Sequence, residues 1–295
     1  MSGPPPLFDR ALHRRRLDRA APGYADFLKR RAADDMVFRL EGIMRRFPLA
    51  VDLGARTGAF AQALAASGAR EKVDLLIETD LSAPMLARGG TRIVADEERL
   101  PFRPGSLDLV VSSLALHWTN DLIGALVQAR LALKPDGLFI GAFFGGATLT
   151  ELRQSLLSAE AELSGGASMR VSPFAEPSDA GGLLQRAGFA LPVADVDRVT
   201  VRYAHPVELL RDLRAMGETN VLLERSRTPL TRRVLGRALE LYAEQFTERD
   251  GRVRATFEIV TVTGWSPHES QQKPLPRGSA KMRLAEALGT TEHKL

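Results

Sequence analysis

The stretch AVDLGARTGAF, residues 50–60, decides the fold of this 295-residue chain. An apolar run of strand length ends there in a glycine turn, and an alanine-rich helical segment follows. Gly54 and Gly58 allow the backbone of the turn to approach a ligand closely, because glycine has no side chain. Arg56 lies between them, so the pattern is not the G-x-G-x-x-G of dinucleotide sites, and the lysine of a phosphate-binding P-loop is also absent. The turn therefore predicts a ligand site at a strand end without identifying the ligand.

Outward from this turn, apolar runs of strand length alternate with helical stretches. The runs lie at 49–53, 73–77, 92–95, 107–114 and 138–144, and two later ones lie at 193–203 and 255–265. Their spacing leaves room for crossover helices, which predicts βαβ units on a parallel sheet covered on both faces. We therefore expect an α/β, Rossmann-like fold with a mostly parallel seven-stranded sheet, helices on both faces, and a helical insertion between the last two strands.

The pattern divides the chain into three parts. Residues 1–47 form an Arg-rich N-terminal helical arm, whose last helix carries an apolar stripe at the spacing of a buried helix face. The stripe consists of Val37, Leu40, Ile43, Met44 and Phe47. Residues 48–265 form the sheet domain, in which the helical insertion 206–249 is a candidate lid or partner surface. Residues 266–295 form an irregular tail.

The charge of the chain argues against a nucleic-acid partner. Lys and Arg number 40 against 36 Asp and Glu, and the basic runs at 14–16 and 29–31 are soon followed by acids. We interpret those runs as solvated helix faces. An acid-free cluster is either an exposed helix flank or a surface for an acidic partner such as a carrier protein. It consists of Arg225, Arg227, Arg232, Arg233 and Arg237.

Composition excludes further classes. The chain has no cysteine, which rules out disulfides, thiol nucleophiles and Cys-ligated metals. No segment reaches the roughly 18–20 apolar residues of a membrane-spanning helix. The first residues, MSGPPPLFDRALHRRR, lack the apolar stretch of a secretory signal. We therefore expect a cytoplasmic protein that starts near Met1 and has no transmembrane segment.

The second predicted strand ends in a carboxylate, at the edge where parallel sheets bind ligands. Asp80, in IETDLSAPML, can accept two hydrogen bonds from a ribose diol. Met85 on the following helix could lie against a purine. Each residue also has an ordinary structural interpretation, Asp80 as a helix cap and Met85 as part of the core.

The next two strands end in a similar way. Asp96 and Glu97, in VADEERLPF, could accept from the exocyclic amino group of an adenine, and Leu114 and His117, in SSLALHW, face the same crevice. These four segments, in this order and spacing, resemble the class I S-adenosylmethionine-dependent methyltransferases. The KPDG turn at 134–137 is also characteristic of that fold.

The resemblance implies S-adenosylmethionine as the cofactor and a set of residues that bind it. The set is Asp52, Gly54, Gly58, Asp80, Met85, Asp96, Glu97, Leu114 and His117. No catalytic residue is identified, and we expect no metal site. Arg56 departs from the pattern, because the superfamily usually has the middle glycine of its turn there. Its side chain could clash with the cofactor or repel its sulfonium, or instead point away or bind the methionyl carboxylate.

Longer phrases resemble one branch of that superfamily. FPLAVDLG, LPFRPGSLDLVVSSLALHW, LKPDGLFIGAFFGG, the MGETN segment at 216–220 and GWSPHESQQKPLPRGSA are similar to the complex I assembly factor 5 family. Members are described as arginine hydroxylases of a respiratory complex I subunit. The resemblance implies a protein substrate and a role in complex I assembly. Hydroxylation normally needs a redox centre, and His117 with His268 and Glu269 could form an iron triad only if the tail folds back over the sheet.

Two other functions stay open. The segment ELLRDLRAMGETN resembles the biotin-pathway malonyl-acyl-carrier-protein O-methyltransferases, which implies an S-adenosylmethionine-dependent O- or N-methyltransferase of a small-molecule or carrier-bound acid. Arg211, Arg214 and Arg225 could hold such a carboxylate, although exposed salt-bridge residues are the simpler interpretation. The other alternative is a non-catalytic assembly chaperone that retains the fold.

Overall fold

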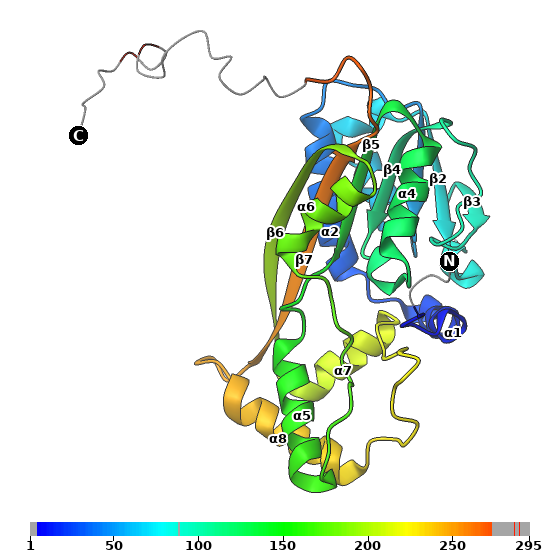
Figure 1. The fold of residues 1–295 in the computed structure, drawn as a ribbon. Helices are drawn as coiled ribbons and strands as arrows, with labels where there is room; N and C mark the ends of the chain where they lie inside the picture. The colour runs from blue at the N-terminus through cyan, green and yellow to red at the C-terminus, as the bar shows by residue number, and fades with distance from the viewer. Residues whose placement is uncertain (1–4, 88, 273–285, 287–288, 290–295) are drawn as a thin grey trace.

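The computed structural model describes residues 5–87, 89–272, 286 and 289. Seven strands form one sheet in the order β3-β2-β1-β4-β5-β7-β6 (Figure 1). They are β1 (Leu49–Leu53), β2 (Leu75–Asp80), β3 (Thr91–Val94), β4 (Leu107–Ser113), β5 (Leu133–Phe144), β6 (Ala190–Tyr203) and β7 (Val253–Trp265). β1 to β5 pair in parallel, whereas β7 runs antiparallel to both β5 and β6. The expected Rossmann-like fold with a mostly parallel sheet is confirmed.

Helices cover both faces of this sheet. The helices of the described residues are α1 (Arg10–Ala20), α2 (Phe27–Glu41), α3 (Ala59–Ala65), α4 (Leu122–Ala132), α5 (Thr150–Ser164), α6 (Pro177–Arg186), α7 (Pro206–Ala215) and α8 (Arg232–Phe246), with short 3₁₀ turns at η1 (Ala21–Gly23), η2 (Gly68–Lys72), η3 (Ala83–Leu86) and η4 (Leu116–Trp118). α2 and α3 cover one face, and α4 and α6 cover the other. In β5, Phe139 joins the core beneath α4 and α6, and the next residue, Ile140, joins the core beneath α2 and α3. Successive side chains of a strand point to opposite faces of the sheet. Both residues are fully buried, because helices cover both faces.

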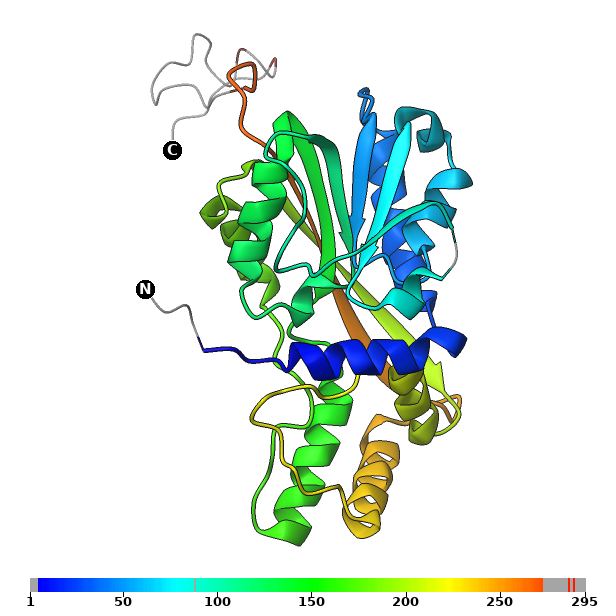
Figure 2. The ribbon, with the colours of Figure 1, turned by 90° about the vertical axis from the view of Figure 1, so that its right-hand side faces the viewer.

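A second group of helices lies beyond the sheet. α5 and α8 pack together, and α7 joins them where β6 and β7 extend past the other strands (Figure 1). α1 lies across the boundary between the sheet and this helical group (Figure 2). The carboxyl ends of β1, β2 and β4 therefore face α1, and the ligand edge predicted from the sequence is covered by the N-terminal arm.

The expected stripe at the end of the arm does not continue as a helix. α2 ends at Glu41, with Gly42 as its C-cap, so that only Val37 and Leu40 of the stripe lie on the helix. Phe47 is buried after the helix, but Met44 is 98% exposed. The prediction was wrong because the apolar spacing continues through Ile43, Met44 and Phe47, beyond the end of the helix.

Two further element limits differ from the prediction. β5 begins at Leu133, so the KPDG segment lies within the strand, at a bulge where Asp136 has a φ of +61°. The insertion is less helical than expected, because α7 and α8 are separated by an irregular segment at 217–231. The bulge has little effect on the candidate site, whereas the irregular segment at 217–231 forms part of that site.

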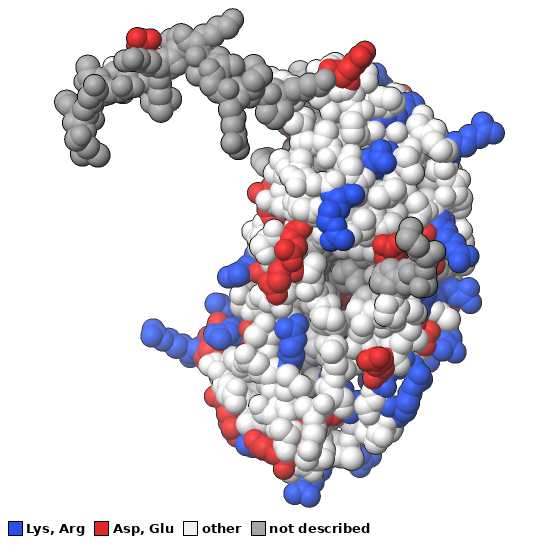
Figure 3. Space-filling model, viewed as in Figure 1, with Lys and Arg blue, Asp and Glu red and all other residues white. Residues whose placement is uncertain are grey.

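Lys, Arg, Asp and Glu are interspersed over the face drawn in Figure 3. Several basic residues of the arm are solvated ion-pair partners, as predicted, and Arg31 binds Asp197 at 2.7 Å. Lys29, from the same basic run, is buried, so the interpretation of that run as a solvated face is wrong for this residue. No helix within the described ranges is long and apolar enough to cross a membrane.

Candidate functional site

The glycine turn after β1 lies against the ends of β3 and β4. Gly54 and Gly58 have φ values of +71° and +81°, in the left-handed region that favours glycine. A Cβ atom at Gly54 would clash with that of Ala115 and would lie 3.1 Å from Glu97 Oε1. Protein atoms therefore fill the space over Gly54.

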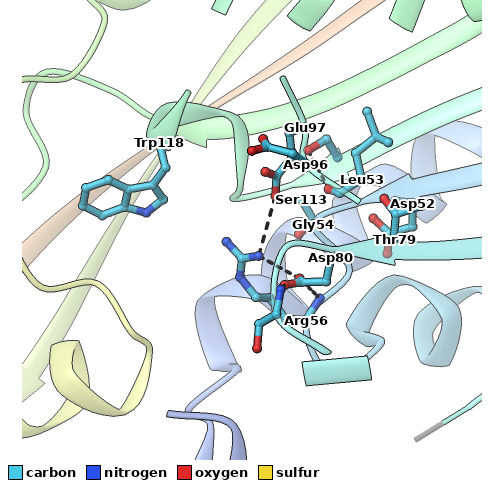
Figure 4. A network of polar contacts seen from close by, with 12 residues as sticks. Asp52, Leu53, Gly54, Arg56, Thr79, Asp80, Asp96, Glu97, Ser113 and Trp118 are labelled. Atoms are coloured by element: carbon cyan, nitrogen blue, oxygen red, sulfur yellow. Dashed lines mark hydrogen bonds and ion pairs between the residues drawn. The ribbon is translucent and has the colours of Figure 1, made fainter. Parts of the chain in front are cut away.

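Asp80 ends β2 and is fully buried. Its Oδ2 accepts from the Arg56 backbone N–H at 2.9 Å and from Arg56 Nη1 at 2.7 Å, and its Oδ1 accepts from Ser82 N–H at 2.8 Å. Figure 4 shows the Arg56 guanidinium between Asp80 and Glu97. Burial lowers the pKa of Arg56, but the charges of Asp80 and Glu97 outweigh it, and the net shift is upward. Asp80 therefore binds a permanent cation at the place where the sequence predicted a ribose diol.

Asp96 and Glu97 follow β3 and bind a second guanidinium. Arg10 Nη2 donates to Asp96 Oδ1 at 2.5 Å and also to Glu97 Oε2. The Arg10 side chain is 13% exposed, and that of Glu97 is 2% exposed. Asp9 caps α1 by accepting from Leu12 N–H at 2.9 Å, which fixes the helix start beside these acids. The two carboxylates are thus bridged by the N-terminal arm rather than left free for an adenine.

A buried lysine and a buried aspartate lie beneath the turn. Lys29 of α2 donates from Nζ to the Gly54 carbonyl at 2.7 Å and to the carbonyl of Ser113. Asp52 is fully buried, and neither carboxylate oxygen has a hydrogen-bond partner in the described part of the chain. Burial lowers the pKa of Lys29 and raises that of Asp52, and the charge of each residue opposes the shift of the other. This lysine ties α2 to the ends of β1 and β4.

The end of β4 carries Leu114 and leads to an aromatic cluster. Leu114 has a φ of +46° and is buried. Trp118 Nε1 donates to Glu218 Oε2 at 2.8 Å, and His117 Nε2 lies 3.3 Å from the same oxygen. The His117 ring packs against Phe144, with their centroids 4.8 Å apart. Glu218 belongs to the irregular segment of the insertion, so this segment contacts the predicted crevice. The role of the insertion as a lid stays a prediction.

Met85 lies at the edge of the crevice, under α1. It is buried together with Leu17 and Ala20 of that helix. A cavity of about 620 Å³ is lined by Gly58, Glu78 and Met85, but Asp80, Asp96 and Glu97 do not line it. Met85 thus packs against the arm in the position where the sequence predicted contact with a purine.

S-adenosylmethionine does not fit this crevice as it stands. The Arg56 guanidinium binds Asp80, Asp96 and Glu97 hold Arg10, and Arg56 lies between the two acidic groups. The cavity beside Lys29 and Leu114 has a volume of about 10 Å³. That volume is close to the minimum for one water molecule. The predicted residues share one edge of the sheet, but they surround the protein's own cations.

Sequence reasoning missed Arg10, Lys29, His13 and Glu218. Arg10 and Lys29 stand in basic stretches that resemble solvated arms, and nothing local in the sequence indicates that the arm folds over the sheet. The sequence did contain a signal for Glu218, the MGETN segment at 216–220. This segment resembles known families, but no role was assigned to it. The predicted holders Arg211 and Arg214 are exposed, and Arg225 lies 3.7 Å from Asp9.

The conditional iron triad is not formed. His268 follows β7 and contacts Ser270, and the nearby Gln271 binds Asp136 near the start of β5. His117 instead contacts Phe144, at the other end of the same strand. Over the described ranges, no group of three or more His, Cys, Asp or Glu side chains could hold a metal ion.

Comparison with known proteins agrees with the observed fold. A family model described as a methyltransferase domain matches residues 51–141, which include the glycine turn and the ends of β1 to β4. A solved structure described as a putative methyltransferase from Bacillus halodurans has a TM-score of 0.54 at 15% identity, covering 80% of this chain and 99% of that one. Fold and crevice together define a protein of the class I methyltransferase fold.

Relatives that match this chain over most of its length identify its family within this class. The arginine hydroxylase NDUFAF5 of Danio rerio, mitochondrial by name, is 41% identical over 290 residues, covering 95% of this chain and 89% of the relative. A malonyl-(acyl-carrier protein) O-methyltransferase of Halorhodospira halophila is 34% identical over 285 residues, covering 93% of this chain and 94% of the relative. The chain belongs to the family of the arginine hydroxylase NDUFAF5, and the carrier-protein methyltransferases are more distant relatives.

Proposed function

We propose that this protein is an enzyme that modifies, by hydroxylation, an arginine side chain of a protein substrate. The family relation supports the proposal, and one observation of the structure carries it. Three carboxylates at the strand ends bind guanidinium groups, Arg56 at Asp80 and Arg10 at Asp96 and Glu97. A planar guanidinium is the group that such carboxylates recognise best. A substrate arginine would take the place of Arg10, which the first described helix supplies.

The substrate proposed from the sequence resemblance is a subunit of respiratory complex I. In this proposal Asp96 and Glu97 bind and orient the substrate arginine, and α1 moves aside to admit it. Hydroxylation also requires an external oxidant, so the residues assigned here bind and position the arginine and do not supply the oxygen. The cytoplasmic location expected from the sequence stays a prediction, whereas the relatives in this family are mitochondrial by name.

Mass spectrometry tests this function directly. The full chain is incubated with a cell extract as the source of oxidant and with a complex I subunit peptide that contains one arginine. We expect the arginine peptide to gain the mass of one oxygen atom, and the same peptide with lysine to stay unchanged. The double variant Asp96→Asn/Glu97→Gln should abolish the gain, and Asp74→Asn, a change at an exposed acid, should not. An unmodified arginine peptide would contradict the proposal.

S-adenosylmethionine-dependent methyl transfer is the second candidate. Similarity to the carrier-protein methyltransferase along nearly the whole chain favours it. The residues that would hold the cofactor are those predicted from the sequence, from Asp52 to His117. Binding would require the Arg56 guanidinium to leave Asp80. In the same assay this candidate predicts a mass gain of one methyl group on a carboxylate substrate, and no gain of oxygen.

A further inference from the structure

Arg56 occupies a backbone position that suits glycine. Its φ is +53°, and the flanking glycines of the same turn also have positive φ. A branched or long side chain in the left-handed region costs strain, which a glycine here would not incur. The strained residue is also a fully buried cation. Such a residue persists only where its surroundings hold it firmly.

The side chain of Arg56 joins the tips of two strands. Nη1 lies 2.7 Å from Asp80 Oδ2 after β2 and 3.8 Å from Glu97 Oε1 after β3. The same Nη1 is 3.6 Å from the position that a Cβ of Gly54 would take, after β1. A single guanidinium thus binds Asp80 at the end of β2, lies near Glu97 after β3, and lies close to the turn after β1.

S-adenosylmethionine places three demands on this crevice, and Arg56 opposes each one. The ribose diol needs a free Asp80 carboxylate, but Arg56 holds it. The methionyl part needs space over Gly54, which Arg56, Glu97 and Ala115 fill. The sulfonium carries a positive charge, and a second cation buried nearby would repel it.

We propose that Arg56 replaces S-adenosylmethionine as the cation that holds the strand ends together, so that this chain does not bind that cofactor. Arg56 is then the residue that separates this protein from methyltransferases of the same fold. The inference concerns the cofactor alone and holds whether or not the protein modifies arginine.

Substitution of Arg56 by glycine should leave a folded protein. Asp80 would keep two backbone donors, the N–H of residue 56 and that of Ser82. Glycine would also relieve the positive φ. Arg56→Asn serves as a second uncharged variant, because asparagine tolerates the left-handed region. Thermal unfolding and circular dichroism identify the folded variants before binding is measured.

The test is isothermal titration calorimetry of the full chain with S-adenosylmethionine and, separately, with S-adenosylhomocysteine. The second ligand lacks the positive charge on sulfur, so it separates charge repulsion from lack of space. We expect no measurable binding of either ligand to the unmodified chain. Arg56→Gly should bind both ligands, with an affinity gain on the order of 100-fold or more. The gain is expected because the buried Arg56 guanidinium no longer competes with the ligand for the Asp80 carboxylate.

Two further variants locate the bound ligand and serve as a control. Adding Asp80→Asn to Arg56→Gly should remove the gained affinity, which places the ligand at the strand ends. Arg46→Gly is the matched control, because Arg46 is an exposed arginine in an ion pair with Asp74. Binding to the unmodified chain within about threefold of Arg56→Gly would overturn the proposal. It would also fall if the folded Arg56→Gly and Arg56→Asn variants both failed to bind.

Discussion

His13 is a buried imidazole without a hydrogen-bond partner for either ring nitrogen in the described structure. Its ring packs against Trp118 with centroids 5.0 Å apart. Burial lowers the pKa of His13 well below 6.5, and the charges of Arg56, Arg10 and His117 lower it further. The folded protein therefore keeps His13 neutral at pH values where the unfolded chain protonates it.

This residue should make the protein less stable in acid. Below about pH 6.5 the unfolded state binds one more proton than the folded state, so the free energy of unfolding falls by up to about 1.4 kcal/mol per pH unit through His13. His13→Leu should remove that part of the slope. Urea unfolding of both proteins between about pH 5 and about pH 8 measures it. His268→Leu, at an exposed histidine, is the control, and parallel curves for the unmodified chain and His13→Leu would contradict this account.

Single residues show how far a site can be predicted from sequence. The sequence placed Asp80, Asp96 and Glu97 at one edge, because parallel strands carry their carboxyl ends together. It could not show that Arg10 would bind Asp96 and Glu97, because this ion pairing depends on how the arm packs, and the arm lies far from these acids in the sequence. For Arg56, the sequence left the direction of the side chain open. Lys29 was misjudged for a related reason, because neighbouring basic residues on a helix point to different faces.

At the scale of elements, α1 closes the ligand edge. Leu17 is fully buried and joins Met85 of η3 in one small core. A Cβ at Gly217, after α7, would lie 2.9 Å from Leu17 Cδ2, so the chain approaches this side chain closely. Asp18 adds a hydrogen bond, accepting from Ser82 Oγ at 2.6 Å. The helix is thus held by apolar contacts, of which Leu17 is the fully buried anchor, and by polar contacts along its length.

Removing the anchor should loosen the helix. Leu17→Ala is expected to destabilise the protein by about 3 kcal/mol, because a buried leucine leaves a cavity. It should also expose the arginines of α1 to trypsin at lower enzyme concentrations than in the unmodified chain. Denaturant unfolding and limited proteolysis measure the two effects. Leu131→Ala, at a leucine that is 47% exposed, should change neither by much. An equal effect of both variants would show that Leu17 is not an anchor.

Elements were predictable where burial sets their pattern. β4 and β5 are buried on both faces, so their continuous apolar runs marked them clearly. The end of α2 was placed too late, because Met44 and Phe47 continue the apolar spacing beyond the Gly42 cap. Apolar spacing indicates which residues are buried, not which are helical, and Phe47 is buried although it lies outside the helix.

At the scale of the whole molecule, the cover of the site is built from two distant parts of the chain. Asp9 N–H donates to the Val221 carbonyl at 2.8 Å, and Leu223 N–H donates to the Leu7 carbonyl at 2.9 Å. This pairing joins the start of α1 to the irregular segment of the insertion. Asn120, after η4, ties the pair to the sheet domain, because its Oδ1 accepts from Leu7 N–H and Phe8 N–H, each at 2.7 Å. The arm and the insertion should therefore open together.

Asn120→Ala tests this coupling. The side chain of Asn120 also donates to the Phe8 carbonyl at 3.3 Å, so the substitution removes three hydrogen bonds. At about 1 kcal/mol each, their loss should increase local opening on the order of 100-fold. Hydrogen exchange should become faster at Asp9 and Leu223 together, since each donates to the other segment, while amides of β1 and β4 keep their rates. Gln62→Ala, at an exposed amide that donates to the Thr57 carbonyl, is the control. Faster exchange at Asp9 with an unchanged rate at Leu223 would show that the two segments open separately, and a substrate arginine would then need to displace α1 alone.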